Sequence, residues 1–352
     1  MKSKWKIIVL TGIGIVVVLL SRYLVNSCRK EQNVNNNKFP SKYSGKSEFV
    51  EFDIDIVSGI ENKFLYKSTA TITEFDATLA VPLMFKDKFD SSSIEKKDNN
   101  FIHENGNTFF VQKNYLSFNS NSQLQKDIMK SFSLFKETYT ADQFEVAEFV
   151  DTSLNQKIID QCISLGVNNM RVYKVYNLDY HTLQSNENHT DKLGNKIPVA
   201  LRREWTEEDS STFWLGRQVW QGLPVFCSSY SSEVIDTWAP IQILYTRNGI
   251  EKLQVLYAFQ FRMETKKINL KSFESIATAV EKEYSMILTD NRYVAKRAEL
   301  YYWVDVNQDE HELKMIPVWV VTIREYDKAK ENYVEIQKIV NAETAEIIET
   351  GE

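Results

Sequence analysis

The chain has 352 residues and a formal net charge of −6, and 43% of its residues are hydrophobic. An acidic chain lacks the concentrated basic face that nucleic acids require, so no nucleic-acid partner is expected. The low numbers of glycine and proline, eleven and six, exclude collagen-like and low-complexity architectures, and the length suffices for two domains of ordinary size.

The N-terminus predicts an export or anchoring signal. Lys2, Lys4 and Lys6 precede an uncharged apolar run at residues 7–20. A basic segment before a short apolar stretch is typical of a signal peptide, whereas a membrane-spanning helix needs about 20 apolar residues. Because basic residues stay on the cytoplasmic side, the bulk of the chain is expected to lie outside the cytoplasm and to contact the membrane through this segment.

Two forms of attachment stay open. The tetrapeptide Val25-Asn26-Ser27-Cys28 resembles a bacterial lipobox, in which the cysteine becomes lipidated. Extension of the apolar run to residue 25 would instead give an uncleaved single span. Residues 1–28 are therefore predicted to be a signal peptide or a membrane anchor, with Cys28 as the lipidation site if the protein is a lipoprotein. Residues 29–47 are polar and rich in asparagine, which predicts a flexible linker.

Residues 48–200 are predicted to form an N-terminal α+β domain. Apolar and acidic residues alternate at 48–57, which predicts a strand with one buried face. Ser153 and Gly166 are a suitable N-cap and C′ residue for a helix at 153–166. The other expected elements are strands at 63–75, 78–85, 108–118 and 170–183 and a helix at 122–139.

Residues 201–352 are predicted to form a C-terminal α+β domain. Asn248-Gly249 is the clearest turn of the chain, because Asn-Gly favours a tight hairpin. Helical spacing at 272–288 begins at Ser272, a suitable N-cap. The other expected elements are strands at 212–226, 241–245, 253–263, 294–306 and 315–326 and a closing hairpin of 333–340 with 345–348. The order predicts an α+β fold of antiparallel sheets, each packed by helices, behind the N-terminal anchor.

Three short motifs carry a resemblance. Gly222-Leu223-Pro224-Val225-Phe226 precedes the run Ile316-Pro317-Val318-Trp319-Val320-Val321, and a closing turn follows at 340–348. They resemble a PepSY-type unit, from whose usual closing turn Asn341 and Ala345 depart. The layout is similar to that of uncharacterised lipoproteins of low-GC Gram-positive bacteria and, more distantly, of the membrane-anchored YycH/YycI regulators of a sensor kinase. The resemblance implies a non-catalytic extracytoplasmic protein of PepSY-like units and supplies no catalytic residue.

Residues suited to metal binding or catalysis are few. The four histidines are His103, His181, His189 and His311. None of them forms an HExxH motif, and the chain has no Cys-x-x-Cys pair. Asp305-x-Asn307-x-Asp309 resembles the start of a calcium loop, but Glu310 stands where the turn needs glycine. We therefore expect no catalytic residue, no metal site and no cofactor.

The cysteines and tryptophans favour packing roles. Cys162 lies on the apolar face of a predicted helix, and whether it pairs with Cys227 stays open. The tryptophans fall in or beside strand-like segments, where core packing is favoured over a ligand-binding face. These are Trp205, Trp214, Trp220, Trp238, Trp303 and Trp319.

Two functions from different classes remain. The favoured one is a membrane-anchored extracytoplasmic binding or regulatory protein, with an envelope protein or a peptide as partner. The alternative is a cell-envelope hydrolase with paired carboxylates, to which the acidic run Glu204, Glu207, Glu208 and Asp209 could contribute. The hydrolase requires a pocket in which Asp or Glu side chains converge, and the binding protein does not.

Overall fold

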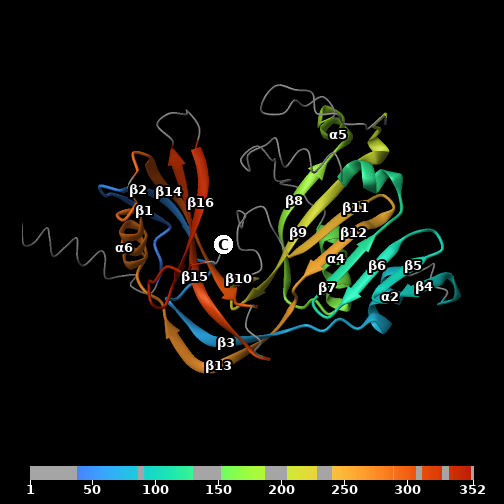
Figure 1. Cartoon of the computed structure of the whole chain (residues 1–352), viewed down its shortest axis with the longest axis horizontal. Coiled ribbons are helices and arrows are strands. Elements are labelled where there is room, and N and C mark those ends of the chain that lie inside the picture. The colour runs from blue at the N-terminus through green and yellow to red at the C-terminus, as the bar shows by residue number, and fades with distance from the viewer. Residues whose placement is uncertain are drawn as a thin grey trace, which may run out of the picture.

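Sixteen strands of one mixed sheet dominate the described part of the computed structural model (Figure 1). The structure describes residues 38–85, 91–129, 152–186, 204–227, 240–287, 289–306, 311–326 and 333–349. The predicted anchor at 1–28, with Cys28, and most of the predicted linker lie outside the described residues. Figure 1 shows two halves of the sheet side by side, which we call the β14 half and the β9 half.

The β14 half is built on two long antiparallel strands, β14 and β15, which are paired along most of their length. Two strands pair in parallel with the outer edge of β14. Strand β2 pairs with its first part and β10 with its last part. On the outer side of β15, β3 and β16 pair with it antiparallel. The strands are β1 (Lys42–Lys46), β2 (Val50–Val57), β3 (Phe64–Ile72), β10 (Leu223–Cys227), β13 (Phe259–Asn269), β14 (Arg292–Val304), β15 (Leu313–Tyr326) and β16 (Tyr333–Asn341).

The β9 half is antiparallel in the order β8-β9-β11-β12-β7-β6-β5-β4. Its strands are β4 (Ile94–Lys97), β5 (Asn100–His103), β6 (Thr108–Gln112), β7 (Tyr115–Asn119), β8 (Met170–Leu178), β9 (Ser211–Trp220), β11 (Ile241–Thr246) and β12 (Gly249–Leu256). The turn between β11 and β12 contains Asn248, so the hairpin predicted from Asn248-Gly249 is confirmed.

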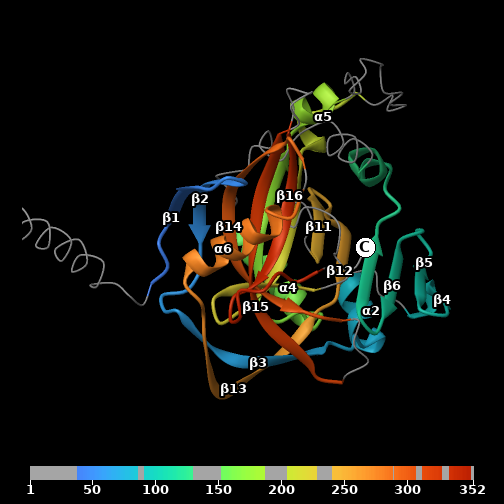
Figure 2. The same cartoon turned by 60° about the vertical axis from the view of Figure 1, so that its left-hand side comes forward.

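Short helices cover parts of these sheets. They are α2 (Ala77–Phe85), α4 (Thr152–Ser164), α5 (Tyr180–Asn186) and α6 (Phe273–Tyr284), with 3₁₀ turns η3 (Ser91–Ser93) and η5 (Glu207–Asp209). Figure 2 shows α6 against the sheet of the β14 half. There Phe273 meets Trp319 edge to face, with ring centroids 5.3 Å apart. Helices α2 and α4 share a core with the β9 half, where Ile158 and Phe109 are fully buried.

The two cysteines of the described residues lie in different cores and form no disulfide with each other. Cys162 belongs to the core under α4, and Cys227 belongs to the core under α6. Burial raises the pKa of the Cys162 thiol to about 12, so this thiol stays protonated at neutral pH. The disulfide that the sequence left open is therefore not formed.

A short joint connects the two halves. Leu223 and Pro224 pair with β9, while Val225–Cys227 pair in parallel with β14. Gln221, in the preceding turn, has a φ of 47°, and its side chain forms four hydrogen bonds. Its Oε1 accepts from the Tyr66 N–H at 2.9 Å, and its Nε2 donates to the Tyr66 carbonyl at 2.8 Å. The amide thus satisfies the main chain of β3 as a neighbouring strand would.

A second glutamine strengthens the same joint. The Gln218 Oε1 accepts from the Phe259 N–H at 2.7 Å, and its Nε2 donates to the Phe259 carbonyl at 2.8 Å. Beside it, a Cβ added at Gly222 would lie 3.0 Å from the carbonyl oxygen of Gly59. A side chain at this position would push the Gly59 carbonyl away, and the φ of 85° also favours glycine.

The predicted α+β fold class, with antiparallel sheets that are each packed by helices, is wrong. The described strands form one mixed network with two parallel pairs, β2 with β14 and β10 with β14. Alternation identifies the buried face of a strand but not its partner, and β2 and β14 are far apart in the chain. Pairing also crosses the predicted boundary between residues 200 and 201, because β3 lies between β13 and β15.

The predicted strand at 78–85 is also wrong, because these residues belong to α2. A short apolar run fits a buried strand or a buried helix equally well. The deciding signal is Asp76, whose Oδ1 accepts from the Thr78 N–H at 2.8 Å and so caps the helix. The predicted helices at 153–166 and 272–288 are confirmed as α4 and α6, and Ser272 is the N-cap of α6.

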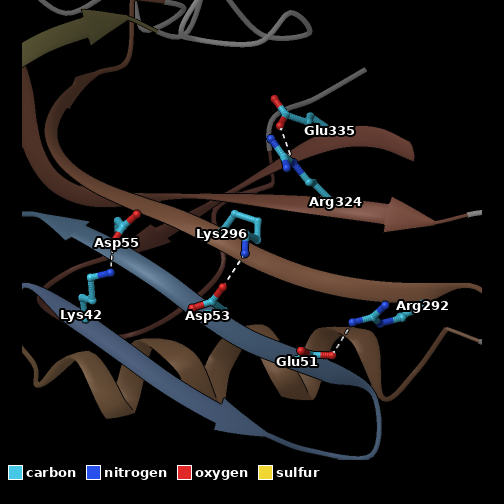
Figure 3. Close-up of polar contacts among 8 residues, drawn as sticks. All are labelled: Lys42, Glu51, Asp53, Asp55, Arg292, Lys296, Arg324 and Glu335. Atoms are coloured by element: carbon cyan, nitrogen blue, oxygen red, sulfur yellow. Dashed lines mark hydrogen bonds and ion pairs between the residues drawn. The ribbon is translucent and has the colours of Figure 1, made fainter. Parts of the chain in front are cut away.

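Ion pairs connect the strands on the face of the β14 half opposite α6 (Figure 3). Arg292 on β14 contacts Glu51 on β2 at 2.7 Å, and Lys296 contacts Asp53 at 2.5 Å. The hydrogen bonds and charges of these cations hold the pKa of Glu51 and of Asp53 below the ordinary values. The pairs therefore favour the parallel alignment of β2 with β14, and salt screens them because they are exposed.

Acid is expected to weaken this alignment. A carboxyl whose pKa is lowered by folding stabilises the fold above its unfolded pKa, near 4, and this stabilisation disappears as pH falls through the folded pKa. The urea midpoint of unfolding falls as the pH is lowered from about 6 to about 3. This fall should therefore be smaller in the double variant Glu51→Gln/Asp53→Asn than in the wild type. Asp55→Asn, which removes the longer Lys42–Asp55 pair at 3.3 Å, is the control. Equal acid slopes in the wild type and the double variant would contradict the role of these pairs.

Candidate ligand-binding cleft

A cleft of about 590 Å³ opens in the β9 half between α2, α4, the β5–β6 turn and the β11–β12 turn. This volume is in the range of ligand pockets. We call it the amide cleft, because Asn105, Asn107, Gln161 and Asn248 all line it. Its opposing turns come from segments that are far apart in the chain.

The floor of the amide cleft is apolar. Its apolar lining residues are Leu83, Met84, Phe85, Phe118, Ile158, Tyr245 and Ile250. Four of them, from Met84 to Ile158, are buried members of the core under α4. Phe85 and Phe118 meet edge to face with ring centroids 6.1 Å apart, so each ring is packed within the protein. The floor is thus a continuation of the core that reaches the cleft.

Hydrogen bonds fix one wall, the β5–β6 turn. The Asn105 Oδ1 accepts from the Asn107 N–H, and the Asn107 Oδ1 accepts from the Asn121 N–H, both at 2.9 Å. The buried His103 accepts at Nδ1 from the Asn105 N–H at 3.2 Å. These bonds use the carbonyl oxygens of both asparagine side chains. Among the described residues, the side-chain nitrogens of Asn105 and Asn107 have no protein partner.

The buried Glu251 fixes the opposite wall, the β11–β12 turn. Its carboxylate accepts from the side chains of Ser120, Ser122 at 2.9 Å, Thr246 at 3.2 Å and Asn248 at 3.2 Å. The contact with Asn248 holds this side chain at the cleft through its Nδ2. Glu251 therefore acts on the cleft by positioning the turn, and four donors compensate the burial of its carboxylate.

Helix α4 adds balanced charge to the cleft. Lys157 and Asp160 are exposed lining residues of opposite sign, one helical turn apart. Asp160 accepts from Gln156 at 2.7 Å. The cleft can therefore donate and accept hydrogen bonds through neutral amides and can hold an apolar group, but its lining contains one carboxylate.

The histidines and the acidic run singled out by the sequence do not converge. His103 lies at the amide cleft, while His181 on α5 and the distant His311 are exposed. Asp209 is buried and caps its own turn, because its Oδ2 accepts from the Thr206 N–H at 3.0 Å. Glu208 instead pairs with Arg247 at the surface.

The remaining sequence candidates fall in cores or outside the described residues. Trp205, Trp214, Trp303 and Trp319 are buried, in agreement with core packing. His189, Trp238, Asn307 and Asp309 lie outside the described residues. The described part of the chain has no group of three His, Cys, Asp or Glu residues that could hold a metal, and none of its helices is long and apolar enough to span a membrane.

The sequence contained the parts of the amide cleft but not their assembly. Asn105-Gly106-Asn107 reads as a loop, Asn248-Gly249 as a hairpin turn and α4 as an amphipathic helix. Each reading is local. Their meeting depends on the strand order between β5 and β11, which no short-range pattern specifies.

Comparison with known proteins supports the fold alone. No protein-family model and no curated protein matches the chain. A crystal structure of an uncharacterised protein from Eubacterium rectale is similar, with a TM-score of 0.59 and 12% sequence identity. The match covers 88% of this chain and 94% of the other. The two proteins thus share an architecture.

Two glycines at the walls of the amide cleft provide a matched test. Gly106 and Gly249 both have positive φ, at 84° and 99°. A Cβ at Gly106 would lie 2.9 Å from the Asn121 Cγ, whereas a Cβ at Gly249 meets nothing within 4 Å. Gly249→Ala should cost about 1–2 kcal/mol through backbone strain. Gly106→Ala should cost about 0.5–1.5 kcal/mol more, because the exposed Asn121 side chain must turn away and lose its hydrogen bond to the Asn105 carbonyl at 3.2 Å.

Urea denaturation of both variants measures the difference. An equal loss in free energy of unfolding would show that the Asn121 contact does not support the β5–β6 turn.

Proposed function

We propose that this chain is a membrane-anchored extracytoplasmic binding protein and that the amide cleft is its ligand site. The observation that carries the proposal is the lining of this cleft, which combines an apolar floor with neutral amide groups on its walls. A mostly preformed cavity with a few placed polar groups is typical of a binding site.

The alternative, a hydrolase with paired carboxylates, has less support. Such a mechanism needs two carboxyl groups on either side of the scissile bond. Asp160 is the one carboxylate that lines the amide cleft. Asp209, from the acidic run, is used in its own turn, and Glu208 is used in an ion pair.

The anchor rests on the sequence of residues 1–28. Lysines before an apolar run favour export, and Cys28 provides a lipidation site if the segment is cleaved. The resemblance of the C-terminal part to PepSY-type and YycH/YycI proteins is consistent with a non-catalytic role. Either form of anchor would hold the amide cleft close to the outer face of the membrane.

Retention of envelope compounds tests this function. Full-length protein in nanodiscs is incubated with soluble envelope-derived peptides and muropeptides, and retained compounds are identified by mass spectrometry. We expect retention without a change in ligand mass. Ser164→Trp, at the lining of the cleft, should weaken retention about tenfold or more, which corresponds to ~1.4 kcal/mol.

Ile163→Trp is the matched control. Ile163 is the neighbour of Ser164 on α4 and is 45% exposed, but it does not line the cleft. This variant should retain ligands as the wild type does. Hydrolysed products that disappear in Asp160→Asn would contradict a binding role.

The intact mass of the same preparation distinguishes the two forms of anchor. Cleavage before Cys28 with added acyl groups indicates a lipoprotein, and a full-length unmodified mass indicates a membrane span.

A further inference from the structure

We propose that the amide cleft binds an extended peptide segment with apolar side chains. The peptide main chain would bond to the amide walls, and its side chains would occupy the floor. This inference rests on the proposed binding function and specifies the chemical class of its ligand.

The amide walls match the hydrogen-bonding groups of a peptide. Each peptide unit has one N–H donor and one carbonyl acceptor, and asparagine and glutamine side chains have the same groups. Asn105 and Asn107 have side-chain nitrogens without a protein partner among the described residues. On the opposite wall, the Asn248 and Gln161 side chains donate through their nitrogens, to Glu251 and to Met84. Their oxygens, Asn248 Oδ1 and Gln161 Oε1, accept no hydrogen bond from the described residues. Donors and acceptors are therefore both available.

The α2 side of the cleft extends its apolar floor to the surface. Every residue of α2 except Thr78 is apolar. Leu79 is 65% exposed, and Leu83, one turn further along the helix, lines the cleft. Met84 continues the same lining, and its flexible thioether adapts to side chains of different shape. An apolar strip thus leads from the surface of α2 into the cleft, which favours apolar over polar ligand side chains.

The charge of the cleft disfavours a phosphate-rich ligand. Lys157 and Asp160 bring one charge of each sign, whereas a phosphate-rich ligand requires several cations. A sugar ring packs on the open face of an aromatic ring. Phe85 and Phe118 are buried and packed against each other, whereas Tyr245 lines the cleft and is half-buried, so one aromatic side chain remains for such a contact. A neutral peptide segment fits the charge of the cleft, and an oligosaccharide is the competing ligand in the test below.

Fluorescence anisotropy with two end-blocked hexapeptide pools tests the inference on the full-length protein in nanodiscs. One pool carries Leu, Phe or Met at its central positions, and the other carries Ser, Asn or Gln there. We expect the apolar pool to bind about tenfold more tightly or better. N-methylation of the central amides, which removes donors, should weaken its binding about fivefold.

A matched pair of variants locates the contact. Gln161→Leu removes an amide of the cleft and should weaken binding of the apolar pool about fivefold. Gln123→Leu removes an exposed amide outside the cleft, whose side chain donates to Asp127, also outside the cleft, and should leave binding unchanged. The N-methylated pool needs no variant, so the inference stays testable if Gln161→Leu unfolds.

The outcomes separate the ligand class from the binding function. Equal binding of both pools, or of the N-methylated pool, would overturn the peptide inference. If only a labelled N-acetylglucosamine oligosaccharide binds, and Ser164→Trp abolishes that binding, the peptide inference fails and the proposed function stands. If neither peptides nor the oligosaccharide bind, both fail.

Discussion

The hydrogen-bonded joint around β10 is the constraint on which the rest of the structure depends. Five residues, Leu223–Cys227, pair with β9 at one end and with β14 at the other. Such a short strand gives few ladder hydrogen bonds, and the amides of Gln218 and Gln221 add bonds to the main chains of β13 and β3. Buried amide groups that are fully paired favour one arrangement, because breaking them leaves polar groups unsatisfied.

This joint has a consequence for function. It is part of the continuous strand path from β14 to β9, β11 and β12, whose register sets the place of Asn248 at the amide cleft. The cleft itself is a product of tertiary structure, because the β5–β6 turn, the β11–β12 turn and α4 meet only through the sheet. The Glu251 carboxylate then holds the β11–β12 turn in place, because it accepts hydrogen bonds from Thr246 and Asn248.

Local features of the fold could be predicted from the sequence, and long-range ones could not. Ser272 predicts the start of α6, and Asn248-Gly249 predicts the β11–β12 hairpin. Both predictions succeed because capping and turn formation depend on neighbouring residues. The parallel pairing of β2 with β14 has no such local signal, and the expected separate helix-packed sheets were therefore wrong. At the cleft, His103 is visible in the sequence only as an isolated histidine, and the role of Gly106 depends on its contact with Asn121, which lies in another turn. The anchor at 1–28 stays a prediction.

Hydrogen exchange in Gln221→Ala tests the role of the joint most directly. The variant removes the acceptor of the Tyr66 N–H and should lower the free energy of unfolding by about 1–3 kcal/mol. Amide exchange should increase in β3, β10 and β13 and should stay unchanged in β4, β5 and β6. Gln221→Asn, which tolerates the positive φ but has a shorter side chain, should behave like the alanine variant. Unchanged exchange in β3 and β10 would contradict the account.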